Sequence, residues 1–279
     1  MKRKNHLSMP PSVEYIYFFT LAVLALAILC ESFMPRRELT QGLVWRWTNN
    51  FSLSLLTWYC STLAGAWFMF WLANWTEVRQ FGLLPRMGAG PIYAFFALLF
   101  VAQLLGYLLH IAFHKVSWLW PIHAVHHSDV DVDASTSYRH HPLEPLLMIP
   151  LMSPIIVGLG TPMEVVFTYK LFAIAITVFS HSNVRLPKVI DKYARLIILT
   201  PDFHRLHHCS EAVYTNSNYG SVVPWFDYLF GTATNRPYEE QESMELGLEY
   251  LRAPIDGRLD KLLLSPITIH RELESVDSR

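Results

Sequence analysis

The chain has 279 residues, of which 52% are hydrophobic, 14% aromatic and only 16% charged. A soluble domain carries about 25% charged residues, so the shortfall favours a chain that lies largely in a lipid bilayer. The formal net charge of −1 excludes the strong basic field that recruits nucleic acid. Cys30, Cys60 and Cys209 are scattered, and they form neither a disulfide framework nor a CxxC zinc pattern.

The first predicted element is a membrane helix over residues 15–30. A basic start with Lys2, Arg3 and Lys4 precedes this apolar run, as it does in a signal peptide. No small-residue cleavage site follows, because the next residues are Glu-Ser-Phe-Met-Pro at 31–35. We therefore expect this segment to be retained in the membrane.

Two further apolar segments come next. Residues 51–73 carry no charge and are long enough to span about 30 Å of hydrocarbon as one helix. Their tryptophan and tyrosine side chains suit the membrane interface. The other segment runs from Pro91 to Leu109, and proline at its first position is a favourable helix start. Both segments are predicted to be membrane helices.

Residues 143–160 and 163–179 are also apolar, and Gly158, Gly160 and Pro162 lie between or beside them. This pattern predicts a helical hairpin that dips into or crosses the membrane. Lys170 lies within the second arm, and we interpret it as a snorkelling or packing residue rather than one buried with a partner. The acidic, polar tail after residue 237 is expected to carry no chemistry.

Thirteen histidines are the compositional anomaly, because eight of them fall within 110–127 and 204–208. They form one HxxxH box and two HxxHH boxes. On a helix, residues three or four apart lie on one face, so each box can direct its imidazoles at a metal. The eight box histidines are His110, His114, His123, His126, His127, His204, His207 and His208.

The number of imidazoles predicts two metal ions. A single ion needs about four ligands in a tetrahedral site or six in an octahedral one, and eight exceed both. His126 and His127 point about 100° apart on a helix, so they can serve different ions. Histidine is also the commonest metal ligand. His6 and His270, by contrast, are interpreted as packing residues, and the role of His140 is left open.

Several other residues are candidates for additional ligands or for hydrogen bonds that orient the imidazoles. His141 precedes the predicted hairpin, and His181 and Asn183 follow it. Six acidic residues near the boxes are candidates for the orienting hydrogen bonds: Asp129, Asp131, Asp133, Glu144, Asp202 and Asp227. Asp131 and Asp133 are expected to be solvated loop residues instead. Cys209, which follows a histidine pair, is expected to pack rather than to bind metal.

The order of the boxes resembles the fatty acid hydroxylase/sterol desaturase superfamily, a group of membrane-bound non-haem di-iron enzymes. The similarity extends over roughly residues 90–235 and beyond the histidines themselves. It includes HHSD at 126–129, RHHPLE at 139–144, PDFHRLHH at 201–208, NYG at 218–220, WFD at 225–227 and FGT at 230–232.

This resemblance implies a helical membrane core whose histidine-lined site is capped from the aqueous side. It implies two iron ions, O₂ and two electrons from a redox partner, such as a b-type cytochrome, a ferredoxin or an NAD(P)H reductase. It also implies hydroxylation or desaturation of a lipid. Only the resemblance selects iron, because imidazole suits zinc equally well. Some relatives have paired histidines where this chain offers only His181, so Asn183 or a water molecule is an alternative ligand there.

Two other functions remain as alternatives. A membrane metal transporter or storage protein should place ionisable residues along a path through the membrane, and only the cationic Lys170 does so. A zinc-dependent membrane hydrolase needs a carboxylate base, and no HExxH motif occurs. We rank the hydrolase last.

The predicted fold class is an all-α integral membrane helical bundle with a histidine-box di-metal site capped on the cytoplasmic side. The predicted organisation is N-terminal membrane segments at 1–90, a catalytic region at 91–235 and a polar tail at 236–279. The expected location is a bacterial inner membrane, or the ER membrane in a eukaryote, with the site facing the cytoplasm and its reductants. If three segments span before the site, the basic N-terminus lies on the other side, against the positive-inside rule. The lipid itself, whether fatty acyl, sterol or related, is left open.

Overall fold

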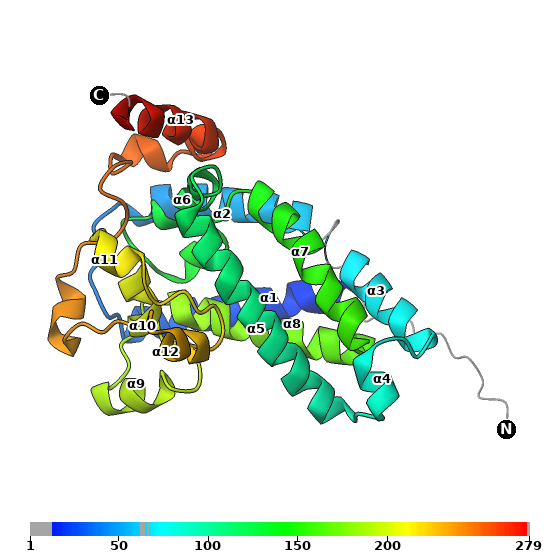
Figure 1. Ribbon diagram of the computed structural model, residues 1–279. Coiled ribbons are helices and arrows are strands. Elements are labelled where there is room, and N and C mark those ends of the chain that lie inside the picture. Colours follow the sequence, from blue (N-terminus) through cyan, green and yellow to red (C-terminus); the bar gives the residue numbers. More distant parts are fainter. Residues whose placement is uncertain (1–12, 62–64, 66, 278–279) are drawn as a thin grey trace, which may run out of the picture.

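The computed structural model describes residues 13–277 except 62–64 and 66, and every regular element in this part is a helix (Figure 1). The predicted all-α fold is confirmed. Three helices are long and apolar enough to cross a membrane: α1 (Val13–Phe33), α5 (Pro91–Lys115) and α8 (Met163–His181). They include the predicted segments at 15–30, 91–109 and 163–179. The basic N-terminus and His6 lie outside the described residues, as does the side chain of His270.

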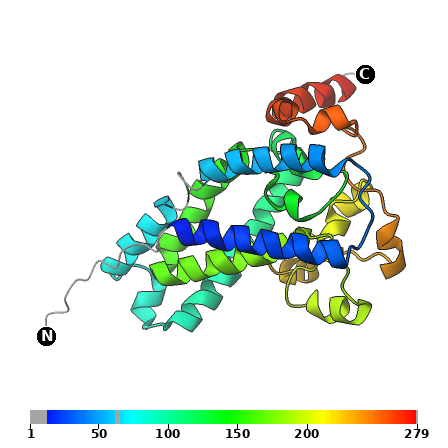
Figure 2. The same ribbon diagram turned by 180° about the vertical axis from the view of Figure 1, so that it is seen from behind.

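The three long helices end on the same side of the molecule. Glu31, near the end of α1, accepts hydrogen bonds from the backbone N–H groups of Ala134 and Asn183. The last turns of α5 and α8 carry His114 and His181. Figure 2 shows α1 and α8 lying side by side. The C-terminal ends of these helices therefore lie together, next to the histidine boxes.

The chain between α1 and α5 departs from the prediction. One spanning helix over residues 51–73 was expected, but α2 (Leu43–Ser61) ends before α3 (Trp67–Val78) begins, and α4 (Leu83–Met87) follows. No described helix spans residues 51–73, and the buried face of α2 is polar, with Arg46, Asn50 and Thr57 on it. These groups require polar partners, which the histidine-bearing face of the protein provides.

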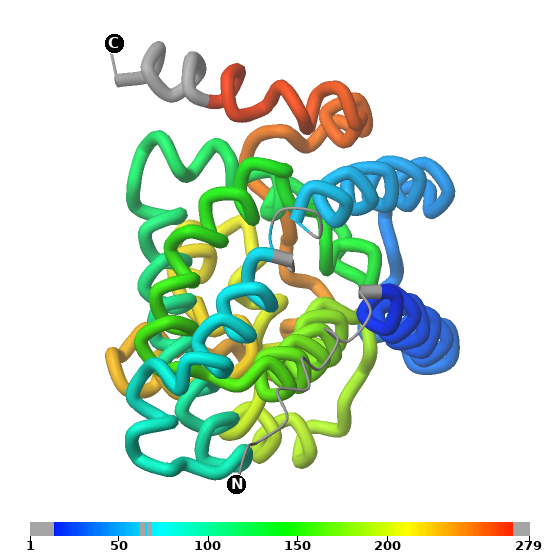
Figure 3. The backbone as a smooth tube through the Cα atoms, turned by 90° about the vertical axis from the view of Figure 1, so that its right-hand side faces the viewer, coloured from blue at the N-terminus to red at the C-terminus, as the bar shows by residue number. Residues whose placement is uncertain are grey.

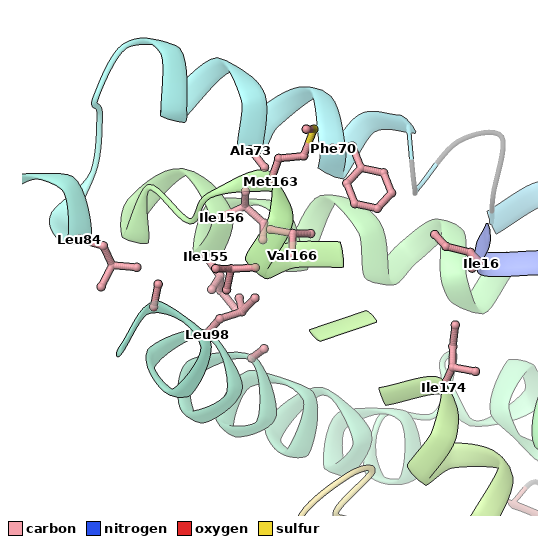
Figure 4. Close-up of a cluster of buried hydrophobic side chains, with 13 residues drawn as sticks. Ile16, Phe70, Ala73, Leu84, Leu98, Ile155, Ile156, Met163, Val166 and Ile174 are labelled. Carbon is pink, nitrogen blue, oxygen red and sulfur yellow. The ribbon is translucent and has the colours of Figure 1, made fainter. Parts of the chain in front are cut away.

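The predicted helical hairpin is present as α7 (Leu143–Leu159) and α8, joined at Gly160. Gly160 has a φ of 66°, and a Cβ there would lie 2.0 Å from the carbonyl oxygen of Phe81. Only glycine fits this turn. Both arms pack on α3 and α5, and α8 also packs on α1. Figure 4 shows the buried apolar cluster between these helices, with Ile155 on α7 and Val166 on α8.

Shorter helices cover the ends of the long ones. They are α6 (Trp120–His127), η2 (Ala134–Tyr138), α9 (Lys188–Ala194), α10 (Pro201–His207), α11 (Ala212–Thr215), α12 (Trp225–Phe230), η3 (Tyr238–Glu242) and η4 (Pro254–Gly257). Two of them, α6 and α10, carry the second and third boxes. Helices α6 and α10 therefore bring the second and third boxes to the C-terminal ends of α5 and α8.

The C-terminal residues, expected to be a polar tail, fold over the second box. Helix α13 (Leu259–Asp277) packs on α6, where Leu262 contacts Val125 and Ile269 contacts Ala124. Figure 3 shows α13 lying across one end of the bundle. The segment leading to it is anchored by buried Met244. This region therefore covers α6, which carries the second box, from outside.

Candidate metal centre

Nine histidines from four helices converge in two clusters, in each of which one ring nitrogen per residue lies within 4.8 Å of the others. The first cluster is His110, His114, His123, His127 and His207. The second cluster is His126, His181, His204 and His208. All eight box histidines belong to one cluster or the other, and His181, which was an uncertain candidate, belongs to the second.

Neighbouring residues in a box face different clusters. On α6, His126 points into the second cluster and His127 into the first, as the helical angle between them predicts. The third box divides in the same way, with His207 in the first cluster and His204 in the second. Each HxxHH box therefore contributes to both clusters and holds them next to each other.

Backbone carbonyl groups fix the ring orientation in the first cluster. The Nδ1 atoms of His110 and His207 each lie 2.6 Å from a carbonyl oxygen, of Tyr219 and Ser217 respectively. A carbonyl oxygen only accepts, so each Nδ1 carries the proton and each Nε2 of the neutral ring carries a lone pair. These two Nε2 atoms lie 3.1 Å apart. Two lone pairs at this distance repel unless a cation lies between them.

The second cluster repeats this arrangement around His181. Its Nδ1 donates to the carbonyl oxygen of Thr177 at 2.7 Å, which leaves Nε2 free to accept. That Nε2 lies 3.0 Å from Nε2 of His204 and 3.2 Å from Nε2 of His126. Two nitrogens bound at right angles to one ion, each at about 2.1 Å, are separated by about 3.0 Å. The spacing therefore fits shared metal coordination.

Burial favours the neutral form of five of the clustered rings. It lowers the pKa of His126, His127, His204, His207 and His208 well below the ordinary value, and the neighbouring histidines lower it further. Neutral imidazole is the form that binds metal. Buried imidazole without a partner costs free energy, and a metal ion removes part of that cost. The donor set, the spacing and the protonation state all fit a pair of metal ions.

Two of the candidate acids support this centre, Glu144 by contact with imidazoles and Asp227 through a loop. Glu144 lies 3.1 Å from Nδ1 of His123 through one oxygen and 3.1 Å from Nδ1 of His140 through the other. Asp227 accepts hydrogen bonds of 2.7 Å from the backbone N–H groups of Tyr219 and Gly220. It thereby holds the loop whose Tyr219 carbonyl orients His110. Both contacts are of the kind that orient metal-binding imidazoles.

Asp129 binds side chains of α2 rather than an imidazole. Its carboxylate accepts hydrogen bonds of 2.9 Å from Arg46 and Asn50 and one of 2.7 Å from Thr136. Although burial raises the pKa of Asp129, the guanidinium groups of Arg46 and Arg139 lower it below the usual range. Asp129 therefore joins α2 to the end of α6.

Asp202 has the corresponding role for the third box. It pairs with Arg36, whose Nε lies 3.2 Å from both carboxylate oxygens, and with Arg205 on α10. Arg36 also pairs with Glu242 of η3 at 2.7 Å. The loop between α1 and α2 is thus bound to the third box by the buried pair of Arg36 and Asp202, and to η3 by Glu242, whose side chain is half exposed.

Asp131 and Asp133 are not solvated loop acids, and that prediction is wrong. Both are buried. Asp131 accepts from the backbone N–H of Thr40 at 3.0 Å, and Asp133 pairs with Arg46. The error arose because their partners lie some ninety residues earlier, in a region that shows no motif. The basic residues of this region, which stand out among apolar neighbours, were the available signal.

Other sequence candidates lie outside the two clusters. The Asn183 side chain bonds the backbone N–H and carbonyl of Arg37. His141 Nε2 lies 3.2 Å from the carbonyl oxygen of Leu263. The His140 ring stacks on that of His126, with centroids 4.1 Å apart. Cys209 packs in a small apolar cluster with Leu206 and others, as expected.

An apolar cavity of about 310 Å³ lies between the long helices. The segments at 51–73, 91–109 and 163–179 all contribute residues to its wall, together with α7. Its lining also includes Tyr138, Thr57 and Pro145, and Pro145 directly follows Glu144. The Thr57 hydroxyl donates to the carbonyl oxygen of His140. The cavity therefore reaches the residues that support the metal centre.

A second opening of about 270 Å³ reaches the first cluster from another direction. It is lined by His114 and Trp120 together with residues of α11 and the segment before α13. The Trp120 ring lies 5.1 Å from that of His114, centroid to centroid, and its Nε1 donates to the hydroxyl of Tyr250 at 2.8 Å. The centre can thus be approached from two sides.

Comparison with known proteins agrees with this geometry. Residues 95–232 match the family model described as fatty acid hydroxylase. Ornithine lipid hydroxylase OlsE of Rhizobium tropici is 30% identical over 54% of this chain and 44% of its own length. Alkylglycerol monooxygenase of Homo sapiens is 30% identical over 45% of this chain and 27% of its own length. Very-long-chain aldehyde decarbonylase GL1-6 of Oryza sativa subsp. japonica is 28% identical over 58% of this chain and 24% of its own length.

The chain spans less than half the length of these relatives. No solved structure matches it significantly. The matched residues contain all nine clustered histidines and end two residues after Phe230, the last residue of α12. The order of the boxes, their convergence and the family match agree: this chain belongs to the fatty acid hydroxylase superfamily.

Proposed function

We propose that this chain is a membrane-bound oxidoreductase that uses two iron ions and O₂ to oxidise a C–H bond of a lipid. The observation that carries the proposal is the convergence of nine histidines in two clusters, together with an apolar cavity whose wall includes Thr57, which bonds His140, and Pro145, which follows Glu144. Family membership supports lipid oxidation in general. In hydroxylation, the C–H compound, O₂, two electrons and two protons give the alcohol and water. In desaturation, the same reactants give an alkene and two water molecules.

Different residues of the chain have different roles in the proposed reaction. The nine clustered histidines would hold the two ions, which supply the oxidising chemistry when bound. Glu144 orients His123. Asp227 orients His110 through the backbone of Tyr219. The apolar wall of the cavity excludes water and positions the chain of the lipid, as apolar pockets do for such ligands. The electrons come from a redox partner, such as a b-type cytochrome, a ferredoxin or an NAD(P)H reductase.

We also propose that the centre faces the cytoplasm. The ends of α1, α5 and α8 that support it lie together, so all of the clustered histidines are reached from one side of a membrane. Cytoplasmic reductants then have access to it. The opening beside Trp120 and His114 is a route by which electrons or O₂ would reach the first cluster.

Lipid oxidation by the purified protein tests the function. The protein is loaded with iron, placed in lipid nanodiscs, and given a reductant with or without O₂, and the lipids are measured by mass spectrometry. A gain of one oxygen identifies a hydroxylase and a loss of two hydrogens a desaturase. Lipid turnover that continues without O₂ would refute the proposal.

A matched pair of histidine variants controls the assay. His208→Ala removes a clustered histidine and should abolish turnover, whereas His141→Ala removes a nearby histidine outside the clusters and should retain it. If the protein binds metal with the expected stoichiometry but oxidises no lipid under any condition, the metal transport or storage alternative is supported instead.

A further inference from the structure

An exposed apolar surface lies outside the three helices that can cross a membrane. It is formed by α9 with the residues that follow it and by α12, and the two parts meet where the Tyr228 hydroxyl donates to the carbonyl oxygen of Arg195 at 3.3 Å. Figure 1 shows both helices at the lower left of the molecule. We call this the α9–α12 surface. Its members are apolar side chains that are each more than half exposed: Val189, Ile190, Tyr193, Ile197, Leu229 and Phe230. Soluble proteins seldom expose such residues together, so this surface requires a cover.

The polar side chains of α9 fix which side of the helix faces outward. Residues three or four apart share one helical face, and Val189 and Tyr193 share the exposed face. The inward side is polar instead, because buried Asp191 accepts from the Thr200 hydroxyl at 2.6 Å and pairs with Arg195. A surface helix of a soluble domain has the opposite arrangement, with its apolar side turned inward. The outward apolar side of α9 is therefore held in place by buried polar contacts.

The α9–α12 surface is continuous with a helix that can cross a membrane. Phe226 and Phe230 of α12 pack on α5, with ring centroids 5.3 Å from that of Phe100 and 5.6 Å from that of Tyr107, respectively. Phe100 is itself half exposed, as is Phe96 one turn earlier. The outward face of α5, which a bilayer would cover, therefore runs into α12.

The contacts with α5 also set the depth of α12. The 25 residues of α5 extend over about 37 Å at 1.5 Å per residue, whereas the hydrocarbon core of a bilayer is about 30 Å thick. Tyr107 lies about 12 Å before the end of the helix at Lys115. Even if the whole excess of about 7 Å protruded on the side of the metal centre, Tyr107 would lie within the hydrocarbon. In a membrane that α5 crosses, Phe230 therefore lies at the level of the bilayer rather than above it.

We propose that the α9–α12 surface lies in the bilayer leaflet next to the metal centre, where lipid acyl chains cover it. Tyr193 suits this boundary, because tyrosine gathers at membrane interfaces. Exposed Lys192 on α9 extends toward the lipid head groups while its stem lies along the apolar surface. The Thr200 contact joins α9 to the start of α10, which carries the third box. The third box is thereby anchored to a helix that contacts lipid.

Nitroxide accessibility in nanodiscs of phosphatidylcholine tests the proposal on the full-length protein. Cys30 and Cys60 are replaced by serine and Cys209, which is buried, is retained. One new cysteine is then introduced as Ile190→Cys or Leu229→Cys and spin-labelled. Power-saturation EPR measures collisions with O₂, which concentrates in hydrocarbon, and with a neutral nickel chelate, which stays in water. At both positions the collision rate with O₂ should exceed that with the nickel chelate.

Two matched positions calibrate the measurement. Phe96→Cys, on the exposed face of α5, reports the hydrocarbon and should favour O₂. Val213→Cys, on α11, replaces an equally exposed aliphatic residue outside the α9–α12 surface and should favour the nickel chelate. The protein without an introduced cysteine should give no label signal, and each variant should elute as the native protein does in size-exclusion chromatography.

Two results would overturn the proposal. Nickel collisions at Ile190→Cys and Leu229→Cys as frequent as those at Val213→Cys would show that the surface faces water. Low collision rates with both reagents would show that protein covers it, and spin–spin broadening would identify that protein as a second copy of the chain. The inference goes beyond the proposed function, because it requires no reaction, and failure to oxidise any lipid would leave it intact.

Discussion

His110 and His207 face each other with their Nε2 atoms 3.1 Å apart, while each Nδ1 donates to a backbone carbonyl. One residue lies near the C-terminal end of α5 and the other lies 97 positions later on α10. Neither ring has a proton to place between the two nitrogens in its neutral form. This pairing is the local reason to expect an ion in the first cluster, and it leads to the first prediction.

Replacing His207 with alanine should remove the metal ion of the first cluster and leave that of the second. The native protein should bind two ions per chain, and His207→Ala about one, measured by inductively coupled plasma mass spectrometry after purification. His141→Ala is the control, because His141 lies outside both clusters, and it should keep both ions. A native stoichiometry near zero, or one unchanged in His207→Ala, would contradict the two-cluster assignment.

His181 should be a ligand of the second cluster although it belongs to none of the boxes. Its Nε2 lies 3.0 Å from that of His204, and His181→Ala should leave about one ion per chain, in the first cluster. Asn183→Ala tests the alternative ligand at this position, and both ions should remain because the Asn183 amide bonds the backbone of Arg37. The opposite pattern, with Asn183→Ala losing an ion, would show that the ligand has been assigned to the wrong residue.

Arg46→Met should destabilise the protein strongly. Arg46 pairs with Asp129 and Asp133, and all three side chains are buried, so the variant leaves two buried carboxylates without their cation. Loss of one partner of a buried ion pair costs about 3–5 kcal/mol. The measurement is thermal unfolding in detergent.

The control for Arg46→Met is Arg258→Met, which breaks an exposed pair with Asp260. A surface pair contributes about 0–1 kcal/mol, so this variant should unfold close to the native temperature. Equal unfolding temperatures for the two variants would mean that the buried network does not hold α2 against the site.

Asp227→Ala should weaken metal binding in the first cluster selectively. The carboxylate holds the backbone of Tyr219 and Gly220, and the Tyr219 carbonyl orients His110. Removal of such a supporting contact typically costs 10–100-fold in metal affinity, measured by titration with a competing chelator. Affinity at the second cluster should be retained. Equal losses at both clusters would show that Asp227 acts on folding as a whole.

Gly160→Ala should destabilise the hairpin between α7 and α8. The residue has a φ of 66°, and an added Cβ would lie 2.0 Å from the carbonyl oxygen of Phe81. The left-handed conformation alone costs a non-glycine residue about 1–2 kcal/mol, and the clash adds to it. Gly257→Ala is the matched control, since nothing lies within 4 Å of its added Cβ. Thermal unfolding that ranks the two variants the other way would refute the role given to this turn.

The sequence alone determined the composition-driven features of this protein. Long uncharged runs are helices because only internal hydrogen bonds satisfy the backbone in an apolar medium, and this identified α1, α5 and α8. Helical spacing placed His126 and His127 in different clusters, because 3.6 residues per turn separates adjacent side chains by about 100°. The Gly160 turn was readable from its residues, since glycine between two apolar runs is typical of a reversal.

Only the tertiary structure decided which residues meet from distant parts of the chain. Residues 51–73 have the composition of a spanning helix, yet they fall in two described helices, α2 and α3, and Arg46 of α2 pairs with Asp129 some eighty residues later. The buried positions of Asp131 and Asp133 follow from the same pairing. His181 has no box spacing to mark it, and its place in the second cluster depends on where α8 ends relative to α10. Local sequence fixes periodicity and hydrophobicity, whereas a site assembled across helices depends on contacts that no local pattern encodes.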